Sequence, residues 1–212
     1  MALNANALVT LAKAKDFLGI TTVDKDTEIE RLINTASQSI ERVTKRILVN
    51  ATHTEYHDGR RTNMLQPRQW PITGGASVNG KPQVYFDDGT GSFPASTEVD
   101  DSEYWVHEMS TQIIRQNGNW PLGRRNIKLV YTAGYGVGGD TASMPSDLEN
   151  ACLQYVAWEY RQNNDRRLGV DSKSKLGETV RYTQGIPEFI LELIEPYMRQ
   201  EFPVSPVPVR NG

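Results

Sequence analysis

Two segments near the N-terminus carry apolar residues at helical spacing. In the first, apolar positions recur between Thr10, a typical helix N-cap, and Gly19, a typical residue just after a helix. A longer stripe follows over about residues 24–46, with Thr27 and Glu30 spaced as a capping box at its start. The pattern therefore predicts two helices. The second stripe consists of Ile29, Leu32, Ile33, Ala36, Ile40 and Val43.

From about residue 51 to 134 the pattern changes to short alternating or β-branched segments, separated by Gly, Pro and Asp. The dipeptide Asp88-Gly89 indicates a hairpin between residues 83 and 95. The whole stretch predicts a mostly antiparallel β region. Its candidate strands are residues 52–56, 63–66, 76–78, 83–87, 104–107, 112–115 and 126–133.

The helical period returns in the last third of the chain, where a third helix is predicted over residues 145–163. A polar loop is expected over residues 164–178 and a short strand over 179–183. Pro187 suits the start of a last helix, which Pro196 should bend or end.

The order of helix, helix, β block, helix, helix and tail predicts an α+β fold. We expect a mainly helical core of about four helices, interrupted by an inserted, mostly antiparallel β region and followed by an extended C-terminal tail. In this division the helical core comprises residues 1–50 and 140–201. The inserted β region comprises residues 51–139, and the extended proline-rich tail comprises residues 202–212.

Composition excludes some classes of protein. The formal net charge is −3, so no overall basic field indicates a nucleic-acid partner. The single cysteine, Cys152, lies in a helical pattern and is expected to be a buried, unreactive thiol in a protein from a reducing compartment. The N-terminal residues do not resemble a signal peptide, and no apolar run approaches the roughly 18 residues of a membrane span.

A glycine pattern is the strongest candidate for a cofactor site. Gly134 to Gly139 fit G-x-G-x-x-G after a predicted strand, as in a dinucleotide-binding protein, so a nucleotide-binding enzyme is one alternative function. In such a site the third glycine lies inside the helix, but here five residues intervene before Pro145, and no second strand follows. A flexible turn is therefore the favoured interpretation, and no cofactor is predicted.

His53 and His57 share one face of a predicted strand with Glu55, which could be drawn as a metal site. We favour ordinary surface residues, because no third histidine is near in sequence. The chain also lacks the common hydrolase, Walker and zinc motifs. We therefore expect no metal, no catalytic residues and no enzymatic activity.

Charged clusters offer weaker candidates. The arginine pairs Arg60-Arg61, Arg124-Arg125 and Arg166-Arg167 are separate in sequence and could contact phosphate or acidic partners, although solvated faces are the favoured interpretation. A DNA-binding packaging factor is a further alternative function, against which the net charge argues. By contrast, residues 87–103 contain several acidic residues and no Lys or Arg, which predicts a locally acidic surface.

Several stretches, taken in order, resemble one family. They are LVTLAKAKDFLGI, ASQSIERVTKRIL, MLQPRQWPI, VYFDDG, NIKLVYTAGYG, MPSDLENACLQYVAWEYR and IPEFILELIEPYMR, and they cover nearly the whole chain. In this order they resemble the head–tail connector proteins, also called adaptor or head-completion proteins, of long-tailed bacteriophages and gene-transfer particles.

The resemblance implies a structural virion protein at the head–tail interface, or neck, that assembles in the host cytoplasm. It implies a ring, commonly a dodecamer, beneath the portal protein, which extends the DNA channel and provides a docking platform for a neck, stopper or tail-completion protein. DNA would pass through without sequence-specific binding. No cofactor, catalysis or membrane is implied.

Two sets of residues are candidates for these contacts. The proline-rich tail exposes apolar groups without helical support, and such segments bind partners at little entropic cost, so we expect it to dock on the portal or a neighbouring subunit. The acidic stretch would let DNA slide if it lined the channel. The tail candidates are Phe202, Val204, Pro206, Val207 and Val209, and the channel candidates are Asp87, Asp88, Asp100 and Asp101.

Overall fold

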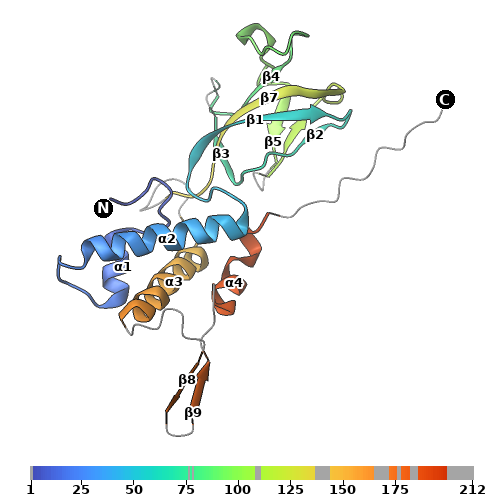
Figure 1. Ribbon diagram of the computed structural model, residues 1–212. Helices are drawn as coiled ribbons and strands as arrows, with labels where there is room; N and C mark the ends of the chain where they lie inside the picture. Colours follow the sequence, from blue (N-terminus) through green and yellow to red (C-terminus); the bar gives the residue numbers. More distant parts are fainter. Residues whose placement is uncertain are drawn as a thin grey trace.

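The computed structural model has its helices at one end and its larger sheets at the other (Figure 1). Four helices pack together into what we call the helical unit, and two antiparallel sheets form the β unit. The α+β prediction is confirmed. The structure describes residues 2–75, 77, 79–107, 111–136, 144–164, 172–175, 178–181 and 186–199.

The helical unit is built from segments far apart in sequence. Helix α2 contacts α1 and α3, and α3 also contacts α1 and α4. The helices are α1 (Leu11–Leu18), α2 (Asp26–Thr44), α3 (Ser146–Asn164) and α4 (Glu188–Ile194), followed by the 3₁₀ turn η2 (Glu195–Tyr197). The buried side chains between them include Leu8, Ile29, Leu32, Ile33, Ile40, Leu148, Cys152, Ile190 and Ile194.

The helix ends follow from local chemistry. Thr10 caps α1, because its hydroxyl accepts a hydrogen bond of 3.3 Å from the Lys13 amide, and Gly19 closes the helix with φ = 68°. The predicted capping box at Thr27 is wrong, since Lys25 is the N-cap of α2 and makes no side-chain capping bond. The first turn of α2 instead carries two acidic residues, which the helix dipole stabilises.

The β unit consists of a four-stranded and a three-stranded sheet, so the predicted mostly antiparallel β region is confirmed. The long strand β7 lies at the centre of the first sheet, with β1 on one side and β3 and β4 on the other. The first sheet contains β1 (Ala51–Gly59), β3 (Ile72–Gly74), β4 (Gln83–Phe86) and β7 (Gly123–Ala133). The second contains β2 (Met64–Leu65), β5 (Tyr104–Val106) and β6 (Ile113–Arg115).

Three local predictions differ from the structure. The strand of the 70s is β3 rather than residues 76–78, of which Ala76 and Val78 lie outside the described residues. Strand β4 does not form a hairpin with the segment after Asp88. It pairs with β7, and the returning chain adds only an isolated bridge from Glu98 to Tyr85. The predicted polar loop of residues 164–178 contains strand β8 (Ser172–Lys175), which pairs with β9 (Glu178–Arg181), the strand predicted over residues 179–183.

The β unit has its own core, separate from that of the helical unit. Trp120, Tyr104 and Tyr131 are its largest fully buried side chains. The Trp120 ring meets Phe86 edge-on, with 6.2 Å between ring centroids. Each unit therefore buries a hydrophobic cluster of its own.

Two short segments run side by side where the units meet. The Tyr135 amide donates to the Leu48 carbonyl at 2.8 Å, and the Asn50 amide donates to the Tyr135 carbonyl at 2.9 Å. The chain therefore enters and leaves the β unit through one isolated parallel bridge, between Val49 and Tyr135. This pairing fixes both connections at a single junction.

Candidate assembly surfaces

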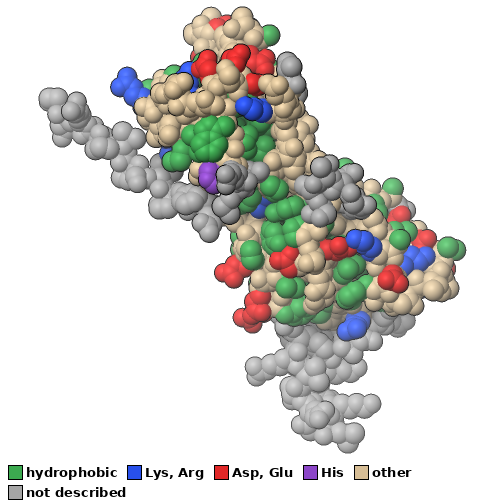
Figure 2. All heavy atoms as spheres, turned by 180° about the vertical axis from the view of Figure 1, so that it is seen from behind, with side chains coloured by type: hydrophobic (Ala, Val, Ile, Leu, Met, Phe, Trp, Pro, Cys, Tyr) green, Lys and Arg blue, Asp and Glu red, His purple; other side chains and the backbone are tan. Residues whose placement is uncertain are grey.

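The carboxylates of the predicted acidic surface form two separate groups, one at each end of β4. Asp87 and Asp88 follow β4, near the start of β7, because the Asp87 amide donates to the Asn126 carbonyl at 3.0 Å. Asp100 and Asp101 lie beyond the other end, since the preceding residue, Val99, donates its amide to the Val84 carbonyl. Figure 2 shows acidic side chains gathered at the outer end of the β unit.

These carboxylates shape their own turns. Asp87 accepts amide hydrogen bonds from Gly89 and Gly91, at 3.1 and 2.7 Å. Asp88 accepts from both the amide and the hydroxyl of Thr90, and Asp100 does the same with Ser102. The side-chain hydrogen bond from Thr90 lowers the pKa of Asp88, and that from Ser102 lowers the pKa of Asp100. Both side chains are exposed and remain ionised at neutral pH.

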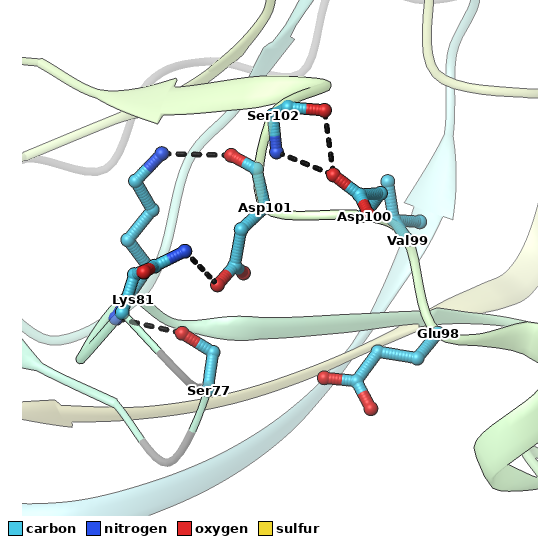
Figure 3. A pocket seen from close by; sticks show the side chains of 8 residues that line it. Ser77, Lys81, Glu98, Val99, Asp100, Asp101 and Ser102 are labelled. Carbon is cyan, nitrogen blue, oxygen red and sulfur yellow. Dashed lines mark hydrogen bonds between the residues drawn. The ribbon is translucent and has the colours of Figure 1, made fainter.

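Asp101 has a more structural role. It borders an open depression on the β unit, which Ser77, Lys81, Glu98 and Ser102 also line (Figure 3). Its carboxylate accepts from the Tyr104 hydroxyl at 2.8 Å and from the Asn79 side-chain amide at 3.1 Å. The Lys81 ammonium donates to the Asp101 carbonyl at 2.7 Å. The cation and these hydrogen bonds tie Asp101 into the fold.

The first glycine of the candidate phosphate loop serves the junction. Gly134 has φ = 114°, and a Cβ atom there would lie 2.7 Å from the carbonyl carbon and oxygen of Val49. Only glycine allows the two connecting segments to approach so closely. Residues 137–143, which include Gly139, lie outside the described residues, and α3 begins at Ser146. The described part of the run thus packs against protein backbone.

His57 and Glu55 form a partly buried network rather than two isolated surface groups. The Glu55 carboxylate accepts from the Tyr131 hydroxyl at 2.6 Å, from His57 Nε2 at 2.8 Å and from the Arg68 amide. Burial acts to raise the pKa of Glu55, but the hydrogen bonds from His57 and Tyr131 outweigh it and lower the pKa. Glu55 therefore stays ionised as the shared acceptor of this network.

No metal centre is evident in the described part of the chain, where no three His, Cys, Asp or Glu side chains are grouped to hold an ion. His53 lies next to Tyr131, with 5.6 Å between ring centroids, and burial lowers its pKa. Cys152 is fully buried, as expected, and burial raises the pKa of its thiol to about 12. None of the described helices is long and apolar enough to cross a membrane.

Arg46 could not be recognised from local sequence beyond its place at a helix end. Only 3% of it is exposed, and its guanidinium donates to the carbonyls of Trp70 in the β unit and of Tyr197 after α4. The same group stacks 3.5 Å from the centre of the Trp70 ring. Burial lowers the pKa of Arg46 to about 10, so it remains charged at neutral pH. It joins three distant segments at the junction.

The structure also locates the arginine pairs. Arg60-Arg61 and Arg124-Arg125, which are far apart in sequence, meet at one end of the β unit, because Gly59 and Gly123 are register partners. Arg166-Arg167 lie outside the described residues, as do all five tail candidates, Phe202, Val204, Pro206, Val207 and Val209.

Comparison with known proteins gives a family match over most of the chain. The model of the family described as "Head completion protein" matches residues 7–200. Among curated proteins, no sequence matches the chain.

Solved structures with a similar fold come from gene transfer agent (GTA) particles. The neck of an empty GTA particle computed with C6 symmetry contains a chain with a TM-score of 0.61 and 16% identity, with 97% of each chain covered. The virion of a native GTA particle contains one with a TM-score of 0.57 and 18% identity, covering 97% of this chain and 96% of that one. The neck of a native GTA particle computed with C12 symmetry contains one with a TM-score of 0.55 and 19% identity, covering 97% and 99%.

Proposed function

Because the chain belongs to the head completion protein family, a structural and non-enzymatic family, we propose that it is a head–tail connector subunit. In this role it forms a ring beneath the portal in the neck of the particle, extends the DNA channel and provides the docking platform for a neck or tail-completion protein. The family match over residues 7–200 carries the proposal. The fold shared with chains of symmetric GTA necks supports it.

The exposed surface suits a ring. A closed ring needs two different patches on each subunit, because one face of a copy meets the opposite face of the next. Large hydrophobic side chains are exposed on both units, which provides apolar area for such contacts. On the helical unit and the loop after α1 they are Phe17, Val23 and Phe189, and on the β unit Tyr56, Met64, Trp105 and Leu122.

The partners follow from this position. They are the portal protein, a neck, stopper or tail-completion protein, further copies of this chain in a dodecameric ring, and DNA that passes through without sequence-specific binding. The tail residues Phe202, Val204, Pro206, Val207 and Val209 provide an apolar, proline-rich segment for docking on the portal or a neighbouring subunit. Deletion of residues 203–212 then abolishes incorporation into particles, whereas normal incorporation would count against tail docking.

The acidic residues are the candidates for the channel wall. Asp88 and Asp100 are exposed and ionised, so a ring that turned them inward would repel DNA phosphates and let the duplex slide. Asp87 and Asp101 are partly buried and hold the adjoining turns in place. A ring structure with these residues on its outer wall would rule this role out.

A mass measurement with class-averaged images tests the ring directly. The protein is measured alone and after mixing with its portal. We expect a closed ring seated on the portal in the mixture, with rotational symmetry in the averages. A protein that stays monomeric and separate from the portal under both conditions would refute the connector function.

A further inference from the structure

The β unit ends in a cluster of four arginines. The segments 59–62 and 120–123 lie side by side, since the Trp120 amide donates to the Thr62 carbonyl at 2.8 Å and Gly59 pairs with Gly123. This places Arg60 and Arg61 at the same end as Arg124 and Arg125. All four side chains are exposed, and we call this group the arginine tip. It lies at the outer end of β1 and β7, where Figure 2 shows basic side chains projecting from the β unit.

The backbone beneath the arginine tip is tightly packed. The Asn126 side chain accepts from the Gly59 amide at 2.8 Å and donates to the Pro121 carbonyl at 3.1 Å, which ties the two segments together. A Cβ atom at Gly59 would lie 1.6 Å from the Pro121 carbonyl oxygen, and one at Gly123 would lie 2.6 Å from the Asn126 side chain. The arginines therefore project from a closely fitted platform rather than from a loose loop.

Two of the arginines occupy backbone conformations that side chains rarely adopt. Arg61 has φ = 56° and Arg125 has φ = 50°, in the left-handed region where glycine or asparagine is usual. A hydrogen bond of 2.6 Å from the Arg125 amide to the Asp58 carboxylate helps to hold this geometry. Strained conformations of this kind persist only where the surrounding fold stabilises them, and they cluster at functional sites.

The guanidinium groups are available to a partner. With the described residues, none of the four arginines forms an ion pair, and only Arg125 has a side-chain partner, the Tyr56 ring at 4.6 Å. The carboxylates nearby are engaged otherwise. Asp58 accepts from the Arg125 amide, and Asp87 and Asp88 accept from their own turns. The tip therefore presents four positive charges whose hydrogen-bond donors point to no neighbouring carboxylate.

We propose that the arginine tip binds the sugar–phosphate backbone of duplex DNA, independently of base sequence. Arginine is suited to this partner, because its planar fork matches a phosphate with two parallel hydrogen bonds. The inference rests on the proposed connector function, which brings a duplex past every copy in the ring. It assigns the point at which the subunit touches the DNA, whereas the exposed carboxylate Asp100, beyond the other end of β4, would face the duplex with the opposite charge.

Salt-dependent DNA binding tests the assignment. The full chain is titrated into a labelled random-sequence duplex, and anisotropy is followed over a series of salt concentrations. The variant Arg60→Ala/Arg124→Ala removes two charges at positions with ordinary backbone geometry. The variant Arg61→Asn/Arg125→Asn removes the other two and retains a residue that tolerates positive φ. The matched control is Arg31→Ala/Arg42→Ala, at two exposed positions on α2 of the helical unit, which changes the net charge equally.

Each tip variant should bind the duplex more weakly, with a shallower dependence of log affinity on log salt. Two lost phosphate contacts lower the slope by about 1.8 for each subunit that touches the DNA, at about 0.9 per contact. The control should retain the slope of the unaltered protein. Thermal unfolding midpoints close to that of the unaltered protein establish that the tip variants are folded.

Three outcomes would overturn the assignment. The first is a DNA affinity and salt slope that are unchanged in both tip variants. The second is an equal loss of DNA affinity in the control. The third is unchanged DNA binding together with a loss of self-association, which would make the tip a contact between copies. Ring formation is measured on the same samples by mass. A protein that binds DNA through the tip without forming rings would contradict the connector function and leave the arginine assignment intact.

Discussion

Arg46 provides the sharpest test of how the two units are joined. Replacing it by methionine keeps much of the side-chain volume but removes the donors to the Trp70 and Tyr197 carbonyls. Each hydrogen bond to a charged group contributes about 1.5–3 kcal/mol, and the stacking on Trp70 adds about 1 kcal/mol. Relief of the cost of burying the charge offsets part of this. We expect Arg46→Met to lower the free energy of unfolding by about 2–4 kcal/mol.

Urea unfolding followed by two probes measures the loss of stability and shows which unit is affected. Tryptophan fluorescence reports mainly the β unit, where Trp70, Trp105 and Trp120 lie, and far-ultraviolet circular dichroism reports mainly the helices. The two transitions should coincide in the unaltered protein and separate in Arg46→Met, because the shared contact is lost.

The control for this experiment is Arg42→Met, an exposed position in the last turn of α2, the helix that ends just before Arg46. It should change stability by no more than about 0.5 kcal/mol. The stability of Arg46→Lys should lie between those of Arg46→Met and Arg42→Met, since lysine keeps the charge but lacks the planar guanidinium that reaches both carbonyls. If Arg46→Met were as stable as Arg42→Met, with coincident transitions, the role of Arg46 at the junction would be refuted.

Three further predictions concern the junction, the Glu55 network and the thiol. Gly134→Ala should destabilise by more than about 1 kcal/mol in urea, because its Cβ would meet Val49, whereas Gly89→Ala, also at positive φ but in open space, should cost less. Because folding lowers the pKa of Glu55, its ionised carboxylate stabilises the fold fully above pH 4.5, and this stabilisation is lost as the pH falls through the pKa of the folded state. The free energy of unfolding, measured as the pH is lowered, should therefore show a decrease that is absent in Glu55→Gln. Cys152 should react with a thiol reagent only after unfolding; fast labelling of the native protein would contradict its burial.

The helices and the longest strands could be predicted from local pattern because their stabilising features are local. The apolar stripe of α2 is buried against α3, and Thr10 and Gly19 bound α1 as expected. The errors arise where local pattern carries no signal. Strand β8 could not be predicted because its sequence, SKSK, is polar and has no hydrophobic alternation, and β4 pairs with a strand more than 35 residues away in the sequence rather than with its neighbour.

Features that depend on tertiary contacts could not be predicted in the same way. In the sequence, Arg46 is one of two basic residues that suit a helix end, and only the fold brings Trp70 and Tyr197 to it. The arginine pairs Arg60-Arg61 and Arg124-Arg125 are unremarkable until the pairing of β1 with β7 joins them. A charge cluster of this kind can therefore be found from the sequence only after the strand register is known.

The position of the β unit depends on how firmly the junction holds it. Each unit has its own hydrophobic core, so burial alone would allow them to move relative to one another. The junction opposes this through the pairing of Val49 with Tyr135, the close approach at Gly134, and Arg46, which ties α2 and η2 to Trp70. In the proposed ring, each subunit would have to present surfaces of both units at fixed positions to its neighbours and to the channel. The buried arginine is therefore the contact through which the helical unit sets where the arginine tip lies.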